Sequence, residues 1–379
     1  MAIHVPEPLA WPLAVIFGLT FVPLWSLFRR LFVAPYAAPV CDLRGKVCVV
    51  TGGNTGIGYE TAVGLAQRGA TVKIACRDAT RGRDAAARAA AAVGTGAGTV
   101  EFVALDLGDL ASVRACAASL TQCDILVCNG GINSLAPAKT TREVRDCAIL
   151  SILAQFGAIL RNSSDASFSS RPSKGYSAVF GVNYVGHQVL VFELQRRLTV
   201  GRIVLLSSVM HRWAAHDAAT LSDPPYNTAL GQLDHNRGYS ESKLNMVLLA
   251  VELNRRAAAA GGGPVAAAVD PGAVRSEIWR HTPGLLMWAW DLLMRATFLT
   301  PAQGAAPSIH AATLPTAALA AAARTKHAPY FAPYPTPDVC PLPFEMMGPF
   351  CGACACAPRL PAEYEAVAAR VVAAVEKRV

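Results

Sequence analysis

Between residues 47 and 128, short continuous apolar runs alternate with amphipathic stretches of helical character. The pattern predicts strands at 47–51, 71–76, 100–105 and 124–128, helices at 57–69, 80–93 and 109–120, and later strands at 202–207 and 264–269. Strands that alternate with helices are typical of βαβ units, in which helices cover both faces of a parallel sheet. The predicted fold class is therefore α/β, a doubly wound parallel sheet in a single domain.

An uncharged apolar stretch of 20 residues precedes this pattern, at 9–28. Its length matches the roughly 20 residues that a helix needs to cross a bilayer core. Arg29 and Arg30 follow at once, and no Lys or Arg precedes it, so the positive-inside tendency places the rest of the chain in the cytosol. A secretory signal would instead begin with basic residues and end at a small-residue cleavage site. We expect a single-pass anchor; Pro12 and Pro23 leave an interfacial or hairpin-like anchor as the alternative.

Charge and cysteine content narrow the class of protein. Lys and Arg outnumber Asp and Glu by 34 to 26, but the basic residues are scattered, so we expect no nucleic-acid partner. Eleven cysteines in 379 residues do not form a secreted disulfide framework, and Cys48 and Cys76 lie in strand-like runs, which favours a reduced, cytosol-facing domain.

The segment CGACACAP at 351–358 could bind metal or carry acyl chains. It lacks a second ligand pair at zinc spacing, so we interpret it as an Ala- and Cys-rich tail and expect no metal.

A glycine-rich turn joins the first predicted strand to the first helix in VVTGGNTGIGYE. Gly52, Gly56 and Gly58 let backbone N–H groups approach a pyrophosphate at the helix N-terminus, where the helix dipole favours negative charge. A plain tight turn is the alternative, but the flanking strand and helix are the context that the motif requires. The turn predicts dinucleotide binding, with Asn54 and Ile57 among its contacts.

The second predicted strand ends in VKIACRD and brings Arg77 to the place where such a fold contacts the adenosine ribose. A ribose 2′-hydroxyl would prefer an acidic partner, whereas Arg suits a 2′-phosphate. Asp78 stands beside Arg77, which tempers the preference. NADP(H) is the predicted cofactor.

Tyr239 and Lys243 are four residues apart in GYSESKLNMV. One helical turn brings such residues to the same face, so the ammonium can lie near the phenol. The pair alone is a weak signal for catalysis, and its meaning depends on the other motifs.

Taken in order, the motifs resemble those of the short-chain dehydrogenase/reductase family. TGGNTGIG, ALDLGDLASV, ILVCNGG, GVNYVGH, RIVLLSSV, the Tyr-Lys pair and VDPG follow the family order over most of residues 45–335. VNYVGH, VDPGAVRSEIWRH and LTPAQGAAPSIHAA resemble the membrane-anchored retinol dehydrogenase branch and its polyprenol-oxidising relatives. The resemblance implies a Rossmann fold and NADP(H)-dependent hydride transfer on a lipophilic alcohol or carbonyl compound.

The resemblance also implies a catalytic tetrad of Asn183, Ser208, Tyr239 and Lys243. Tyr239 would exchange a proton with the substrate oxygen, and Lys243 would favour the phenolate and hold the nicotinamide ribose. Ser208 would polarise the substrate oxygen, and the family pattern prefers it to the adjacent Ser207. Asn183 would position a water that links Lys243 to solvent.

Three further turns are implied to contact the cofactor. They supply Asp106 for the adenine, Asn129 beside the cofactor, and backbone groups of Pro271, Gly272 and Val274 for the nicotinamide amide. The usual family turn Asn-Asn-Ala-Gly reads Cys-Asn-Gly-Gly at 128–131, which makes it more flexible.

Two segments have open interpretations. Residues 278–299 are rich in Leu, Met and Trp, and form either a core helix or a lid over a lipophilic substrate. Relatives would lack residues 142–173, an atypical insert that is either an added lipid-contacting helix or an intron left in a gene model.

The predicted organisation has four parts. They are a membrane anchor at 1–35, a linker at 36–44, the Rossmann domain at 45–340 and a C-terminal extension at 341–379. We expect a membrane protein whose catalytic domain faces the cytosol, with the endoplasmic reticulum as the favoured location and a homodimer left open. A membrane-tethered dinucleotide-binding scaffold with weak catalysis is the alternative function, favoured by the insert and the altered turn and opposed by the intact tetrad.

Overall fold

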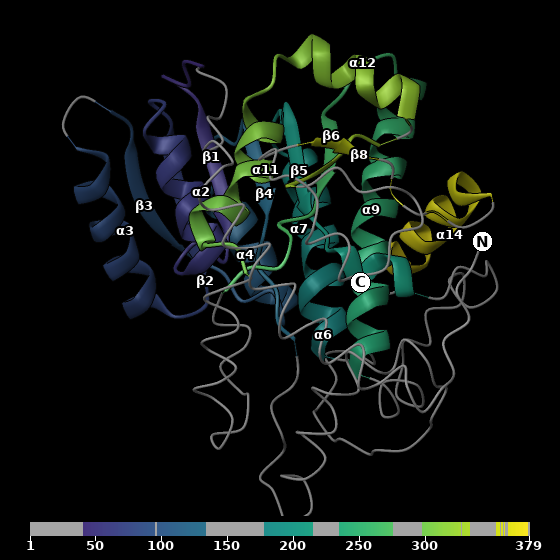
Figure 1. The fold of residues 1–379 in the computed structure, drawn as a ribbon, viewed down its shortest axis with the longest axis horizontal. Coiled ribbons are helices and arrows are strands. Elements are labelled where there is room, and N and C mark those ends of the chain that lie inside the picture. The colour runs from purple at the N-terminus through teal and green to yellow at the C-terminus, as the bar shows by residue number, and fades with distance from the viewer. Residues whose placement is uncertain are drawn as a thin grey trace, which may run out of the picture.

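The computed structural model describes residues 41–94, 97–133, 178–214, 235–275, 298–326, 328–333, 354–356, 358, 360 and 363–377. Eight strands in these ranges form one sheet in the order β3-β2-β1-β4-β5-β6-β7-β8 (Figure 1). The first seven in this order run parallel, and β8 lies antiparallel to β7. The α/β class and the parallel Rossmann-like sheet are thus confirmed.

Six of the strands lie within one residue of their predicted bounds. They are β1 (Val47–Thr51), β2 (Thr71–Cys76), β3 (Thr99–Ala104), β4 (Ile125–Cys128), β5 (Arg202–Leu206) and β6 (Val265–Val269). Val49 of β1 packs into one hydrophobic cluster, whereas Cys48 and Val50 pack into a second cluster. Because successive side chains of a strand point to opposite faces, the continuous apolar runs reflect burial on both sides of the sheet.

Helices cover the two faces in separate layers (Figure 1). One layer holds α2 (Gly56–Ala66), α3 (Ala79–Val93), α11 (Pro301–Thr313) and α12 (Thr316–Lys326). The other holds α4 (Leu110–Ser119), α6 (Ala178–Phe180), the π-helix η1 (Gly181–Val185), α7 (Gly186–Gln195), α9 (His235–Ala259) and α14 (Tyr364–Glu376). A short 3₁₀ helix, η2 (Val209–Trp213), follows β5.

Side-chain caps explain where several helices begin. Asp78 and Asp109 precede α3 and α4, and their carboxylates accept hydrogen bonds from first-turn N–H groups at 3.0 Å. Thr300 and Gln303 form a reciprocal capping box at the start of α11. These local signals set the helix starts independently of the tertiary packing.

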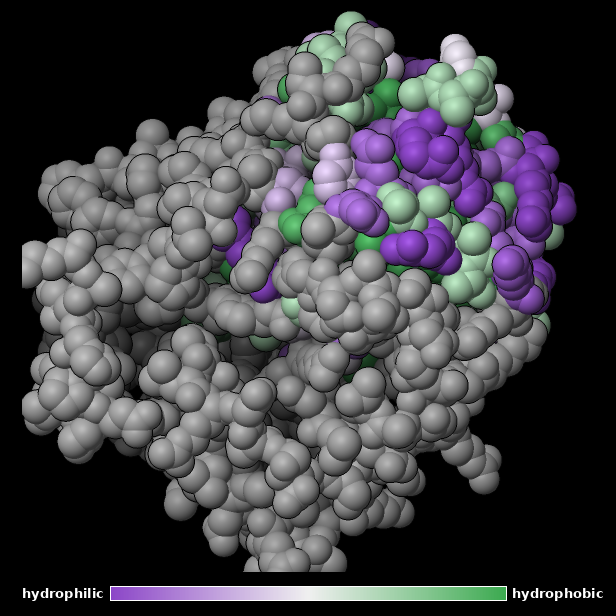
Figure 2. Space-filling view, turned by 90° about the vertical axis from the view of Figure 1, so that its right-hand side faces the viewer, coloured by the Kyte–Doolittle hydropathy of each residue, from purple (hydrophilic) through white to green (hydrophobic). Residues whose placement is uncertain are grey.

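The C-terminal part of the chain completes both the sheet and one helical layer. β7 (Tyr330–Ala332) pairs with β8 (Cys354–Cys356), so interpreting CGACACAP as a tail misses a strand. α14 buries one stripe of small apolar side chains, Val367, Ala368, Val371, Val372 and Val375. Figure 2 faces the side of the molecule that carries α14 in Figure 1, and hydrophilic side chains gather over its described part. The apolar stripe of α14 is accordingly turned toward the core.

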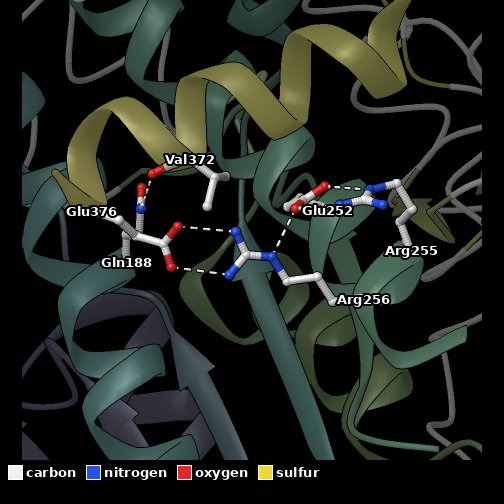
Figure 3. A network of polar contacts seen from close by, with 6 residues as sticks. All are labelled: Gln188, Glu252, Arg255, Arg256, Val372 and Glu376. Carbon is white, nitrogen blue, oxygen red and sulfur yellow. Dashed lines mark hydrogen bonds and ion pairs between the residues drawn. The ribbon is translucent and has the colours of Figure 1, made fainter. Parts of the chain in front are cut away.

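Polar contacts join α14 to its neighbours α7 and α9 in the same helical layer (Figure 3). Arg256 of α9 donates through Nη1 and Nη2 to the two carboxylate oxygens of Glu376 at 2.9 and 3.0 Å, and through Nε to Glu252 at 2.7 Å. Gln188 of α7 donates to the Val372 carbonyl oxygen at 2.8 Å. α14 is therefore bound by polar contacts as well as by its valines.

Among the described residues, none of the helices is both long and apolar enough to cross a bilayer. The predicted anchor at 9–28 and the insert at 142–173 lie outside the described residues. All but the last two residues of 278–299 lie outside them too. Those three predictions stay predictions.

Candidate active site

The predicted site residues gather where the central parallel strands end. Gly52 follows β1, Asn129 follows β4, Ser208 lies two residues beyond β5 and Pro271 lies two residues beyond β6. In open parallel sheets, ligands bind outside the carboxyl ends of the strands. The sheet order therefore brings the glycine turn and the residues of the predicted tetrad to one edge.

The glycine turn packs directly against the turn after β4. Gly52 has φ +62°, a backbone conformation that suits glycine. A Cβ atom on Gly58 would lie 2.4 Å from both the Asn129 Nδ2 atom and the Gly52 carbonyl oxygen. Among the described residues, the Thr55 side chain forms no cap hydrogen bond with α2. The first backbone N–H groups of this helix therefore have no side-chain cap. Asn54 and Ile57 lie in the same turn, and the arrangement suits a pyrophosphate at the N-terminus of α2.

Thr51 ties the two turns together at the end of β1. Its Oγ1 accepts hydrogen bonds from the N–H groups of Asn129 at 2.9 Å and Gly130 at 2.8 Å. The same oxygen lies 2.9 Å from Nε2 of His187, whose Nδ1 lies 2.9 Å from the Asn183 carbonyl oxygen. A carbonyl can only accept, so Nδ1 carries the proton and Nε2 accepts from the Thr51 hydroxyl. His187 thus connects the cofactor turns to η1.

Burial keeps this histidine neutral. Desolvation lowers the pKa of His187 to about 4, against a weaker opposing hydrogen bond to Asn183. The sequence motif GVNYVGH contains His187, but a histidine in an apolar helix carries no pattern that would reveal its two partners. Its role in positioning the turns emerges only from the structure.

Asn183 lies buried in the π-helix and binds the segment after β4. It accepts from the Ile132 N–H at 2.8 Å and donates to the Ile132 carbonyl at 3.0 Å and to the Ser242 hydroxyl at 3.2 Å. A Cβ atom on Gly131 would lie 3.3 Å from Asn183 Oδ1 and 3.7 Å from Lys243 Nζ, so both side chains meet at this turn. Single π-turns inside helices are frequent at functional sites. Asn183 is thus placed near Lys243, with its amide holding the cofactor turn.

Tyr239 and Lys243 share one face of α9. The Lys243 Nζ atom lies 5.5 Å from the centre of the Tyr239 ring and donates to the Leu206 carbonyl at 3.0 Å. Lys243 is 4% exposed, whereas Tyr239 retains a partly exposed surface. Desolvation lowers the pKa of Lys243 to about 8 and raises the pKa of Tyr239. The ammonium is therefore more deeply buried than the tyrosine beside it.

The two adjacent serines have different partners. The Ser207 hydroxyl is buried and donates to the Lys243 backbone carbonyl at 2.8 Å. The Ser208 hydroxyl caps η2 through the Met210 N–H at 3.3 Å, and its hydrogen bond to Tyr239 lowers the phenol pKa against the effect of burial. Ser208 is therefore the serine that the fold brings to the phenol.

The remaining predicted cofactor residues have mixed settings. Arg77 is exposed at the end of β2, while the Asp78 carboxylate accepts from the Arg81 N–H. Asp106 accepts from the Gly108 N–H at 2.9 Å within its own turn.

The turn after β6 carries the other predicted cofactor residues, Pro271, Gly272 and Val274. The Gly272 N–H donates to the Asp270 side chain at 2.9 Å, and Val274 forms a β-bridge with Leu299. The Pro271–Gly272 turn is thus hydrogen-bonded to the Asp270 carboxylate, a residue that the sequence motifs do not single out.

Metal chemistry has no support in the described ranges. No group of three or more His, Cys, Asp or Glu side chains is placed there to hold an ion. Burial raises the pKa of Cys116 to about 11 and of Cys123 to about 12, so these free cysteines are thiols at neutral pH.

Comparisons with known proteins point the same way. Residues 46–216 match the family model described as short chain dehydrogenase. The chain is 36% identical over 309 residues to retinol dehydrogenase 12 from Homo sapiens, covering 76% of this chain and 83% of the relative. It is 36% identical over 268 residues to dehydrogenase/reductase SDR family member 13 from Bos taurus, covering 69% and 60%. A solved structure, an uncharacterized protein from Mycobacterium paratuberculosis, is 28% identical with a TM-score of 0.59, covering 91% and 97%.

Proposed function

The chain belongs to the short-chain dehydrogenase/reductase family, and we propose that it is an NADP(H)-dependent oxidoreductase acting on a lipophilic alcohol or carbonyl compound. Membership of the family supports the dehydrogenase or reductase role. The observation that carries the proposal is the placement of Tyr239 beside both Ser208 and Lys243, at the edge of the sheet where the glycine turn also lies.

These residues supply the proton chemistry that hydride transfer needs. Hydride addition to a carbonyl carbon leaves an alkoxide, which requires a proton, and the reverse reaction requires removal of the alcohol proton. Tyr239 exchanges that proton, because its phenol accompanies Ser208 and Tyr239 is the less buried residue of the Tyr239–Lys243 pair. Lys243 stabilises the phenolate left behind, and Ser208 donates to the substrate oxygen. Asn183 holds the neighbouring turn and provides a polar link toward Lys243.

The cofactor assignment rests on the end of β2. The Asp78 carboxylate serves as the N-cap of α3, accepting from the Arg81 N–H at 3.0 Å. An acidic side chain used in this way is a poor partner for a ribose 2′-hydroxyl, and the exposed Arg77 beside it suits a 2′-phosphate. Gly52, Gly56 and the N-terminus of α2 would hold the pyrophosphate. The bound cofactor would supply the hydride.

The lipophilic substrate and the membrane location rest on sequence features and relatives. Relatives named as retinol dehydrogenases match 75 to 77% of this chain. The apolar stretch at 9–28 would anchor the protein with its catalytic domain facing the cytosol, and the segment 278–299 would lie over the substrate. Retinoid, polyprenol and steroid compounds all fit this description.

A screen of NADPH and NADH oxidation tests the proposal on the full chain in detergent. Retinal, a polyprenal, a steroid ketone and a fatty aldehyde serve as substrates. We expect turnover with NADPH, and a loss of about a hundredfold to ten-thousandfold in Tyr239→Phe, the usual range for removal of a general acid. NADPH binding, followed by fluorescence, should survive the substitution. Full activity in Tyr239→Phe would contradict the role, and tight NADPH binding without turnover of any carbonyl would favour a binding scaffold.

A further inference from the structure

A carboxylate is buried at the carboxyl end of β6, directly before the Pro271–Gly272 turn. Asp270 is 4% exposed, and its backbone N–H donates to the Phe331 carbonyl of β7 at 2.8 Å. Its side chain accepts from the Gly272 N–H at 2.9 Å. A buried charge is unfavourable unless it is hydrogen-bonded and paired. The surroundings of Asp270 must therefore supply positive charge.

Side chains from three elements face this carboxylate. They are Tyr239 and Lys243 of α9, Arg212 of η2 and Tyr330 of β7. The Tyr330 hydroxyl donates to Asp270 and lies 3.4 Å from Nδ1 of His211, which donates to the Ser208 carbonyl oxygen 2.7 Å away. His211, Arg212 and Tyr330 are all buried. Two cations and two phenols thus interact with the carboxylate, and the His211 imidazole contacts one of these phenols.

The sheet register places Asp270 level with the proposed proton-transfer residues. Leu206 of β5 pairs with Val269 of β6, and Lys243 donates to the Leu206 carbonyl at 3.0 Å. Ser207 donates its N–H to the Val269 carbonyl at 2.7 Å, so the two strand ends remain paired up to the site. Neighbouring strands lie about 4.8 Å apart, so Asp270 begins one strand away from the carbonyl that accepts from the Lys243 ammonium. Opposite charges attract more strongly where water is excluded.

We propose that Asp270 is a positioning residue whose buried carboxylate provides the counter-charge for the Lys243 ammonium and so favours the proton-donating form of Tyr239. The inference rests on the proposed function, since it concerns the same Tyr239 and Lys243. Arg212 shares the negative charge, and Tyr330 fixes the carboxylate in place. The consequence is a site set for carbonyl reduction, in which a neutral phenol gives its proton to the forming alkoxide.

The electrostatics of the three groups agree in direction. Desolvation lowers the pKa of Lys243, and the Asp270 carboxylate opposes that shift. Desolvation raises the pKa of Tyr239, and Asp270 raises it further. Burial also raises the pKa of Asp270, opposed by the Gly272 N–H, Arg212, Tyr330 and Lys243. Asp270 therefore favours an ammonium beside a protonated phenol, and Tyr330 helps Asp270 stay ionised.

The pH profile of NADPH-dependent carbonyl reduction tests the inference. In the natural protein, turnover should fall on the alkaline side as Lys243 loses its proton. Asp270→Asn keeps the shape of the side chain but removes its charge, so this limb should move to lower pH by about one unit, the usual effect of a nearby charge. Tyr330→Phe should move it in the same direction by less. An unshifted alkaline limb in Asp270→Asn would overturn the inference.

A matched control separates this effect from a change in total charge. Asp42→Asn is the same substitution at the opposite end of the sheet, on an exposed residue paired with Arg44. Its profile should coincide with that of the natural protein. Melting temperatures of all variants, taken at neutral pH, establish that each is folded before the profiles are compared.

A second measurement does not require turnover. The Lys243 pKa is lower in the folded chain than in the unfolded chain, so unfolded molecules bind the extra proton and this residue's contribution to stability rises with pH above about 8. In Asp270→Asn the rise should begin about one pH unit lower. Urea unfolding across pH, repeated with Lys243→Met in both backgrounds, isolates the contribution. If no carbonyl is reduced, the proposed function fails; if Asp270→Asn leaves the Lys243 contribution unmoved, the counter-charge role fails.

Discussion

The two halves of the sheet differ in how exposed their charged side chains are. Around β3, β2 and β1, ion pairs such as Lys73 with Glu101 and Arg88 with Asp84 lie at the surface. Around β5 to β8, Lys243, Asp270 and Glu252 are all less than 5% exposed. The half around β1, β2 and β3, here called the nucleotide half, offers backbone N–H groups and glycines to the proposed cofactor. The half around β5 to β8 instead holds charged side chains that are buried away from water.

The contrast follows from the chemistry proposed for each half. Backbone amides and a helix dipole hold a phosphate without any titrating group, so charges nearby can remain solvated. Proton transfer requires groups whose pKa values differ from those in water, and burial provides the difference. Each buried charge then needs a partner, and removing one partner leaves the other uncompensated. We therefore expect substitutions in the second half to cost stability and those in the nucleotide half to affect binding.

Removal of α14 should have the largest effect. A chain that ends after residue 362 exposes the surface covered by Val367, Val371, Val372 and Val375, each worth about 1.5 kcal/mol when buried. The sum, about 6 kcal/mol, is comparable to the whole stability of roughly 5–15 kcal/mol of a typical domain. We expect little soluble protein and a urea midpoint far below that of the full chain. Arg370→Ala, on the exposed side of the same helix, is the control, and a truncated chain as stable as the full one would refute the assignment of α14 to the core.

Glu252→Gln should have an intermediate effect. Glu252 is 1% exposed and accepts hydrogen bonds from the guanidinium groups of Arg255 and Arg256 at 2.7 Å. We expect a loss of about 1–3 kcal/mol in the free energy of unfolding, as for other hydrogen bonds to charged groups. Asp84→Asn breaks an exposed pair with Arg88 and should cost less than about 0.5 kcal/mol. Equal losses would remove the contrast between the two halves.

The same residue predicts a dependence on pH. Burial alone would raise the pKa of Glu252, but hydrogen bonds from Arg255 and Arg256 outweigh it and hold the pKa below its usual value. A carboxyl with a lowered folded pKa stabilises the protein above its unfolded pKa of about 4.3 and loses that contribution as pH falls through the folded pKa. Acid unfolding of Glu252→Gln should accordingly be less steep than that of the natural protein below about pH 5.

Gly58→Ala should cost less stability than Glu252→Gln and should act mainly on cofactor binding. The new methyl group would meet the Gly52 carbonyl oxygen and the Asn129 amide at 2.4 Å, so the turn must shift. We expect about 1 kcal/mol of lost stability and about tenfold weaker NADPH binding, measured by titration of cofactor fluorescence. Gly262→Ala, where a methyl group meets nothing within 4 Å, is the control. Unchanged affinity in Gly58→Ala would place the cofactor elsewhere.

Much of the nucleotide half could be predicted from sequence because its signals are local. Its continuous apolar runs and its glycine turn each lie within a short window, and in the other half the same holds for the four-residue spacing of Tyr239 and Lys243. β1 and β2 match their predicted bounds, and the tyrosine and lysine share a helix face. Such features are encoded in backbone periodicity, which a single sequence displays.

The other half depends on contacts between distant segments. β7 and β8 are three residues each, too short to show a period of two, and β8 exists because its backbone pairs with β7. Asp270 lies next to a recognised motif, yet its partners Arg212 and Tyr330 come from elements far along the chain. A buried ionic group is defined by its surroundings, and those appear only in three dimensions.

β8 and α14 follow the other strands and helices of the fold along the chain, so they are synthesised after them. While the ribosome still holds these residues, the rest of the protein can form its parallel strands, but β7 has an open edge and α9 lacks its cover. Exposed strand edges and apolar helix faces are the surfaces through which incomplete chains aggregate. These surfaces thus stay exposed until β8 and α14 have been made and have packed, and a premature stop codon upstream of α14 would leave them exposed permanently.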